Sequence, residues 1–178
     1  MDSSPPSTWK IRQFRPADLP ACRKLYVEGL LGGKLAENDT GLDIDDIESA
    51  YMHTEGNNFW VAENEAGAVV GMIGVQHHDQ GVGQVRRLRV ATDHRRRGIG
   101  KALLETAITF CKENQYLKVA LDTFTERSAA VEMFQKLGFR HWDTRQAAGK
   151  ELMYFYLDLY SGPPTSRQQD QGFMGATG

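Results

Sequence analysis

Runs of apolar residues with strand or helix spacing divide most of the chain into recognisable elements. Strand-like runs occupy residues 9–14, 59–62, 68–75, 84–90, 117–124, 139–142 and 152–159. Helical spacing of apolar residues marks four further segments, which contain Leu19, Ile44, Ile99 and Ala130. Because β-hairpins are mixed with strand–helix–strand units, the pattern predicts an α+β domain built around one central sheet.

The two ends of the chain differ in composition from the part between them. Residues 1–8 are rich in Ser and Pro, and residues 161–178 are rich in Gly, Pro, Gln and Ser with few large apolar side chains. Such segments bury too little apolar surface to order themselves. We therefore expect a flexible leader over residues 1–8, one domain over 9–160 and a flexible tail over 161–178.

The run over residues 84–90 departs from strict alternation. In a regular strand Leu88 and Val90 lie on one face and Val85 lies on the other. One extra residue between Val85 and Leu88 brings all three to the same face, and a β-bulge, often found beside active sites, does this. The spacing is compatible with such a bulge and with chance slippage in a short run.

The composition narrows the classes of function. The 178 residues are 40% hydrophobic and 25% charged with a net charge of -2, so no bulk electrostatic argument favours binding to nucleic acid or to a membrane. No apolar run approaches the roughly 20 residues that span a bilayer. Cys22 and Cys111 lack metal-ligand spacing, and His77 and His78 are expected in a surface loop. We therefore expect a cytoplasmic protein with two free thiols and no bound metal.

A turn rich in Arg and Gly joins the strand end Leu88-Arg89-Val90 to an apolar helix. Its residues are Arg95, Arg96, Arg97, Gly98, Ile99, Gly100 and Lys101. The glycines let the backbone bend tightly and approach a ligand, and the first N–H groups of a helix have no partner within the helix. Together with the helix dipole and the cationic side chains, they predict a site for a phosphate-bearing ligand.

Two other interpretations of the Arg cluster compete with a phosphate site. A solvated cluster is the first, although cations at a helix N-terminus are electrostatically unfavourable. A nucleic-acid patch is the second, because Arg86, Arg87 and Arg89 come shortly before residues 95–97. However, Arg86 and Arg89 lie on opposite sides of a regular strand, and the segment lacks the aromatic side chains on which bases stack. The phosphate site is therefore the favoured interpretation.

Two motifs resemble the acetyl-CoA signature of the GNAT acetyltransferase superfamily. The first is Leu88-Arg89-Val90 followed by Arg95-Arg96-Arg97-Gly98-Ile99-Gly100, which matches a Leu-x-Val strand end and Arg/Gln-x-x-Gly-x-Gly/Ala. The second, residues 127–139, is similar to Asn-x-x-Ala-x-x-x-Tyr-x-x-x-Gly-Phe. Their order and separation are those of the superfamily, and the resemblance covers residues 9–159.

The resemblance implies a three-layer α/β/α fold. Its central sheet is mixed, mostly antiparallel and seven-stranded, and it splays apart between the fourth and fifth strands. The pantetheine arm of the cofactor pairs with the fourth strand in this superfamily. The bulge expected between Val85 and Leu88 falls on that strand, where the superfamily carries one.

The resemblance also implies an N-acetyltransferase in which an amine attacks the thioester of acetyl-CoA directly within a ternary complex. A catalytically silent acyl-CoA-binding regulatory module is the alternative. Because dimers are frequent in the superfamily, a homodimer is an open possibility. The implied cofactor-binding residues are Leu88, Arg89, Val90, Arg95, Arg96, Arg97, Gly98, Ile99, Gly100, Lys101, Arg127, Ala130 and Phe134.

Arg127 and Phe134 depart from the superfamily motif. Arg127 replaces an Asn that commonly touches the cofactor, so it is expected to reach a phosphate or solvent instead. Phe134 replaces a Tyr that often protonates the departing thiolate, and without a hydroxyl it is expected to pack against the pantetheine arm or the core. The general base stays open among Glu28, Asp122, Tyr154 and Tyr156, each with a solvated carboxylate or a packed ring as its alternative.

The segment from Glu37 to Glu65 holds nine acidic residues and no Lys or Arg. This region contributes to acceptor binding in the superfamily, so the resemblance implies an amine acceptor that is cationic. An acidic helix face exposed to solvent is the alternative.

Overall fold

A computed structural model describes residues 8–29, 40–147 and 149–160 of the chain. Its seven strands form one sheet in the order β1-β2-β3-β4-β5-β7-β6. The strands are β1 (Trp9–Gln13), β2 (Asn58–Asn64), β3 (Val69–Asp79), β4 (Val82–Val90), β5 (Lys118–Phe124), β6 (Arg140–Ala147) and β7 (Lys150–Asp158). β4 and β5 run parallel, and the other neighbouring pairs run antiparallel. Apart from Thr8, the leader and the tail expected from the sequence lie outside the described residues.

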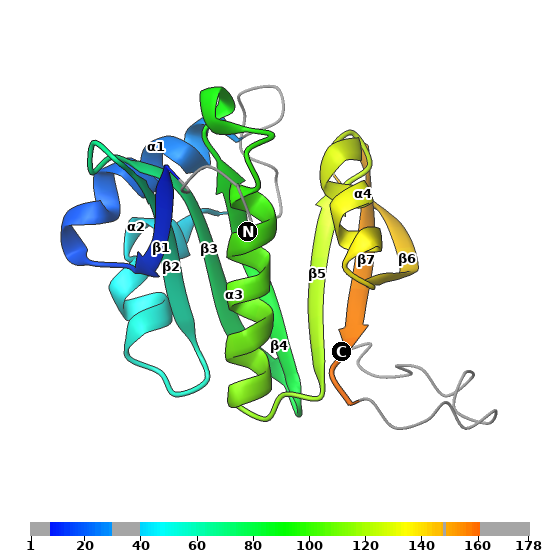
Figure 1. Ribbon diagram of the computed structural model, residues 1–178. Coiled ribbons are helices and arrows are strands. Elements are labelled where there is room, and N and C mark those ends of the chain that lie inside the picture. Colours follow the sequence, from blue (N-terminus) through cyan, green and yellow to red (C-terminus); the bar gives the residue numbers. More distant parts are fainter. Residues whose placement is uncertain (1–7, 30–39, 148, 161–178) are drawn as a thin grey trace, which may run out of the picture.

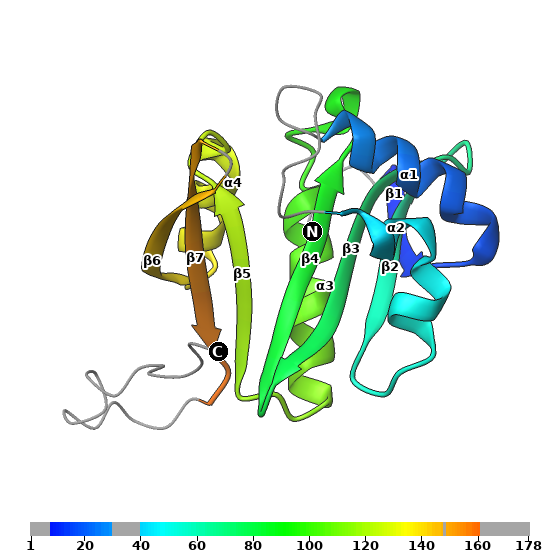
Figure 2. The ribbon, with the colours of Figure 1, turned by 180° about the vertical axis from the view of Figure 1, so that it is seen from behind.

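Helices cover both faces of the sheet. They are α1 (Leu19–Glu28), α2 (Leu42–Asp45), α3 (Ile99–Glu113) and α4 (Ser128–Lys136), with short helical turns η1 (Pro16–Asp18), η3 (Glu48–Met52) and η4 (Thr92–His94). α3 and α4 lie on one face (Figure 1), and α1 and α2 lie on the other (Figure 2). The predicted three-layer α+β fold is confirmed. None of the helices in the described ranges is long and apolar enough to cross a membrane.

Each helical layer has its own apolar core against the sheet. The α3 side of the sheet buries Leu103, Leu104 and Ala107 completely, together with Phe155 of β7. The α1 side buries a second cluster around Tyr51. Each fully buried Leu contributes about 1.5–3 kcal/mol relative to an exposed one. The sheet is thus packed on both faces, and the two cores hold its strands between the helical layers.

The sheet opens between its two parallel strands. β4 and β5 share only three residue pairs, from Val82 with Lys118 to Gln84 with Ala120. Beyond these pairs the strands diverge toward their carboxyl ends, as Figures 1 and 2 show. The part of β4 that follows Gln84 therefore has a strand neighbour on one side only, which is β3. We call this opening the splay.

A β-bulge lies in β4 where the splay begins. Met72 of β3 pairs with Arg89 and Gly74 pairs with Arg86, so Arg87 and Leu88 together face one residue of β3. Arg87 has a φ of 59°, in the left-handed region that non-glycine residues rarely adopt. The side chains of Val85, Leu88 and Val90 consequently pack against the same core. The bulge predicted from their spacing is confirmed.

A buried ion pair holds this unusual backbone in place. Arg87 donates hydrogen bonds to Asp43 of α2 at 2.9 and 2.5 Å, and its guanidinium lies 5.0 Å from the centre of the Tyr26 ring. The Tyr51 hydroxyl donates to the same carboxylate at 2.6 Å. Burial alone would raise the pKa of Asp43, but the hydrogen bonds from Arg87 and Tyr51 outweigh it and lower the pKa. Arg87, with its left-handed backbone, is thus tied to the helical layer formed by α1 and α2.

The helical segment that the apolar spacing predicts around Ile44 is broken into two pieces in the structure. α2 ends at Asp45, and Asp46 leaves helical geometry with φ -145° and ψ 76°. Its carboxylate accepts a hydrogen bond from the backbone N–H of Ser49 at 3.1 Å. An Asp that bonds a nearby backbone N–H competes with a continuous helix, and the π-helical turn η3 follows.

Two strands are longer than the apolar pattern predicts. β3 extends to Asp79, so His77 and His78 lie on a strand and not in a loop, and the prediction for them was wrong. β6 extends to Ala147, although apolar residues suggested an end at Trp142. β6 is an exposed edge strand, so it has no buried face to impose alternation on its sequence.

Asp43→Asn tests whether the ion pair with Arg87 stabilises the fold. The change removes the carboxylate from a guanidinium whose side chain is only 6% exposed, and breaking such a buried pair costs about 3 kcal/mol. Urea denaturation should therefore show a loss of this size. The control is Asp45→Asn on the same helix, where Asp45 lies 3.7 Å from Arg23 in an exposed pair worth less than about 1 kcal/mol. Equal losses in the two variants would contradict this account.

Candidate functional site

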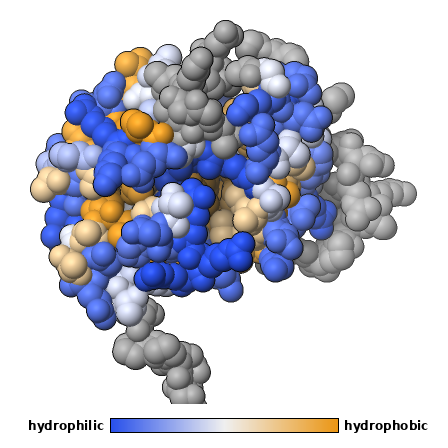
Figure 3. Space-filling model, turned by 90° about the horizontal axis from the view of Figure 1, so that it is seen from above, coloured by the Kyte–Doolittle hydropathy of each residue, from blue (hydrophilic) through white to orange (hydrophobic). Residues whose placement is uncertain are grey.

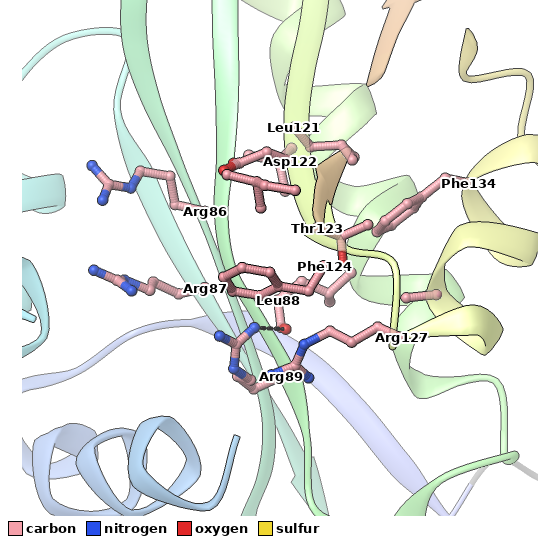
Figure 4. Close-up of a pocket in the computed structure, with 13 residues that line it drawn as sticks. Arg86, Arg87, Leu88, Arg89, Leu121, Asp122, Thr123, Phe124, Arg127 and Phe134 are labelled. Atoms are coloured by element: carbon pink, nitrogen blue, oxygen red, sulfur yellow. Dashed lines mark hydrogen bonds between the residues drawn. The ribbon is translucent and has the colours of Figure 1, made fainter. Parts of the chain in front are cut away.

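The splay encloses a cavity of about 240 Å³. β4 forms one wall, and β5 together with the start of α4 forms the other (Figure 4). The cavity is lined by Val85, Arg86, Arg87, Leu88, Arg89, Leu121, Asp122, Thr123, Phe124, Arg127, Ala130, Phe134 and Leu152. Five of these lining residues, Leu88, Arg89, Arg127, Ala130 and Phe134, were predicted as cofactor-binding from the sequence. The fold therefore brings the two sequence motifs together across the opening.

The wall formed by β4 offers backbone groups as well as side chains. Past Gln84 this strand no longer pairs with β5, and its edge borders the cavity. An open strand edge presents N–H and C=O groups at regular spacing, so it can hydrogen-bond an extended chain of amides. The bulge at Arg87 changes the direction of these groups along the wall of the cavity.

The Arg and Gly turn lies where the splay opens, between the end of β4 and the start of α3. Gly98 has a φ of 84° and precedes the first residue of α3, and residues 95–98 are exposed. A Cβ at Gly100 would lie 3.6 Å from Val90, so the turn sits directly over the end of β4. Seen from above, hydrophilic residues surround a recess with apolar residues inside it (Figure 3). Helix N–H groups and cations thus converge at the wide end of the splay, where the carboxyl ends of β4 and β5 lie apart.

Ile99 belongs to the predicted phosphate turn, but its side chain is buried. It is 1% exposed and belongs to the core beneath α3. Its apolar position begins the buried stripe of the helix, so only its backbone can face a ligand. Cofactor binding by Ile99, through its N–H group, stays a prediction.

Arg127 crosses the wide end of the splay. It stands at the start of α4, and its guanidinium donates a hydrogen bond to the carbonyl of Gly29 at the end of α1. It lies beside Arg89, which donates to the carbonyl of Leu88 at 2.9 Å (Figure 4). Burial and the nearby Arg95 lower the pKa of Arg127. Three cations therefore gather at this end of the cavity, where an anion would relieve their repulsion.

Phe134 of α4 forms part of the apolar wall of the cavity. It is 4% exposed, and its ring centre lies 5.9 Å from those of Phe139 and Phe155. The residue thus packs in the core and also lines the cavity. The core packing expected for it is confirmed, and its contact with the pantetheine arm stays a prediction.

Asp122 and Tyr154 lie on the same face of the sheet, beside the splay. They are paired across β5 and β7, and the carboxylate of Asp122 points toward β4 (Figure 4). Burial and the charge of Asp122 raise the pKa of Tyr154. Two other base candidates lie elsewhere: Glu28 is 3.9 Å from Lys24 on α1, and the Tyr156 ring lies 4.9 Å from the Lys118 ammonium. Of the four candidates, Asp122 alone lines the cavity.

The acidic residues of the segment from Glu37 to Glu65 do not gather into one open site. Asp43 binds Arg87, and Glu63 binds Arg12 of β1 at 2.5 Å. Glu37 and Asp39 lie outside the described residues. Within the described part of the segment, Asp43 and Glu63 are thus held by two different arginines.

A second hollow of about 520 Å³ lies between α3 and the first two strands. Its described lining consists of Ile11, Gln13, Asn58, Trp60, Ala102, Glu105, Thr106, Thr109, Phe110 and Glu113. This lining contains two carboxylates and no Lys or Arg, so it is poorly suited to a phosphate. The smaller cavity in the splay is the better candidate for the predicted ligand.

The model of the acetyltransferase (GNAT) family matches residues 21–139. The chain belongs to this family. It is 39% identical over 103 residues to human N-acetyltransferase 8, a match that covers 55% of this chain and 45% of the relative. It is 37% identical over 100 residues to N-acetylaspartate synthetase of Xenopus tropicalis, covering 56% of this chain and 36% of the relative. The match thus spans less than half the length of these curated relatives.

Solved GNAT structures share the fold of this family member. A GNAT acetyltransferase of Staphylococcus aureus superposes with a TM-score of 0.74 at 22% identity, covering 85% of this chain and 99% of that one. The yncA protein of Salmonella typhimurium, solved with its cofactor acetyl-CoA, has a TM-score of 0.73 at 19% identity, and the match covers 88% of this chain and 97% of that one.

Proposed function

We propose that the protein is an acetyl-CoA-dependent N-acetyltransferase that transfers the acetyl group to a primary amine. The observation that carries this proposal is the splay, which joins an open β4 edge to a cationic helix start in a chain of the GNAT family. The names of its relatives and the acetyl-CoA in the Salmonella structure support the same activity.

The proposed position of acetyl-CoA follows from the chemistry of each wall. The amide-containing arm binds the β4 backbone at Leu88, Arg89 and Val90, with Ala130 and Phe134 opposite. The pyrophosphate is held by Arg95, Arg96, Arg97, Gly98, Ile99, Gly100 and Lys101, in the case of Ile99 through its N–H group alone. Arg127 is proposed to meet the arm or a phosphate, because its partly buried guanidinium lies at this end of the cavity.

The reaction needs a neutral amine, a site for the oxyanion and an exit for the thiolate. We assign Asp122 as the base that accepts the amine proton, directly or through one water, because it is the candidate that borders the cavity. A backbone N–H of the open β4 edge, at the level of Asp122, stabilises the oxyanion while the C–N bond forms. The C–S bond then breaks, and the thiolate, with a reference pKa of about 8.5, leaves without help from a hydroxyl at Phe134.

We also propose that the protein works in the cytoplasm. Cys22 and Cys111 are both buried free thiols. Burial raises their pKa values to about 12, which keeps them protonated and unreactive. Two unpaired cysteines support a reducing compartment.

Thiol release from acetyl-CoA across a panel of primary amines tests the activity together with the base. The wild-type protein should turn over at least one amine, and Asp122→Asn should lower kcat about 100-fold with unchanged affinity for acetyl-CoA. The control is Asp158→Asn on β7, whose carboxylate lies 3.8 Å from Lys118 at the narrow end of the sheet. Binding of acetyl-CoA without thiol release from any amine would favour a silent binding module instead.

Gly98→Asp tests the assignment of the turn to the pyrophosphate. A carboxylate there repels the ligand by about 1.4 kcal/mol or more, so calorimetry should show an affinity for acetyl-CoA reduced about tenfold or more. Gly98→Ala is the matched control, because it carries the same backbone strain at positive φ without the charge, and its Cβ meets no atom within 4 Å. If both variants bind acetyl-CoA like the wild type, the turn has been misassigned.

A further inference from the structure

Cationic side chains dominate the described lining of the splay. Arg86, Arg87, Arg89 and Arg127 line it together with one carboxylate, that of Asp122. Asp43 lies behind this lining and neutralises Arg87. Even with Asp43 included, these groups carry a net charge of two positive units. Such a site attracts an anion and disfavours a substrate that is purely cationic.

The four arginines occupy different levels of the splay. Arg87 is held by Asp43, and Arg89 and Arg127 lie at the wide end where the cofactor arm is proposed to pass. Arg86 precedes the bulge and lies at the level of Asp122 (Figure 4). Among the four lining arginines, it is therefore the one level with the proposed base.

The strand register places Arg86 and Asp122 on the same face of the sheet. Gln84 pairs with Ala120 in the last parallel step before the splay. Side chains two residues apart in a strand share a face, so Arg86 and Asp122 both project to the side covered by α1 and α2. That side is opposite to α3, whose start carries the proposed pyrophosphate site.

Gln76 orients the guanidinium of Arg86, whose positive charge also helps to lower the pKa of Asp43. Its Nη1 donates to Oε1 of Gln76 at 3.1 Å, and the Gln76 amide nitrogen donates in turn to the carbonyl of Ala50 at 3.2 Å. No carboxylate among the described residues forms an ion pair with it. A guanidinium has five N–H donors in a planar fork that suits a carboxylate, so Arg86 retains donors for a bidentate partner.

We infer that the acceptor is an amino acid, whose carboxylate binds Arg86 while its amine lies at Asp122. This inference rests on the proposed acetyltransferase activity and names the class of its acceptor. It differs from the cationic amine that the acidic segment suggested, and two carboxylates of that segment, Asp43 and Glu63, are engaged by Arg87 and Arg12. Arg86 is thus a specificity-determining residue, and Gln76 positions it.

The test compares amino acids with their C-terminal amides as acceptors. Each of the twenty standard amino acids is assayed by thiol release from acetyl-CoA, and each active one is assayed again as its amide. For the wild-type protein, kcat/KM should be about tenfold or more higher for the amino acid than for its amide. Arg86→Gln should raise KM for the amino acid by about the same factor and leave KM for the amide unchanged.

Two further variants keep the test decisive. Gln76→Leu removes the anchor of Arg86 and should raise KM for the amino acid alone, even if Arg86→Gln does not fold. Arg140→Gln removes the same charge from an exposed position on β6 and should change neither KM.

The outcomes separate this inference from the activity on which it rests. If only amines without a carboxylate are acetylated, or if Arg86→Gln and Gln76→Leu affect amino acids and amides equally, the inference is overturned and the acetyltransferase activity stands. If the wild-type protein does not bind acetyl-CoA, or no amine releases thiol, the proposed function itself fails and the inference fails with it.

Discussion

The buried ion pair between Arg87 and Asp43 is the contact on which the arrangement of the site depends. Arg87 has a left-handed backbone, and the two hydrogen bonds to Asp43 tie that backbone to the α1 and α2 layer. The resulting bulge turns Val85, Leu88 and Val90 toward one core while Arg86 faces the other layer. Held in this way, β4 borders the cavity that opens where it parts from β5 after Gln84.

Electrostatics explain why this cavity suits two anions in different places. Helix N–H groups and residues 95–97 concentrate positive charge at the wide end of the splay, and Arg89 and Arg127 add to it there. Arg86 adds a cation on the opposite side of the sheet. Cations gathered in this way raise the energy of the ligand-free protein, so an anionic ligand gains by neutralising them. The sheet thus separates a proposed phosphate region from a proposed carboxylate region.

Patterns local in sequence could be predicted, and contacts between distant segments could not. The spacing of Val85, Leu88 and Val90 predicted the bulge, because a bulge shifts the regular alternation of buried residues by one position, and six residues are enough to show the shift. The partner of Arg87 lies 44 residues away, and no periodicity links the two positions. The ion pairs of the acidic segment could not be predicted for the same reason, since the partners of Asp43 and Glu63 belong to β4 and β1. The length of β6 was underestimated because an exposed edge strand needs no alternation of apolar residues.

Amide hydrogen exchange with and without acetyl-CoA is the most direct test of the claim that the splay is the cofactor site. The account predicts slower exchange, on addition of acetyl-CoA, at the β4 backbone over residues 88–90 and at the turn over residues 95–101. It also predicts no change in the hollow between α3 and the first two strands. Protection confined to that hollow, or acetyl-CoA binding that leaves residues 88–90 unaffected, would contradict the account.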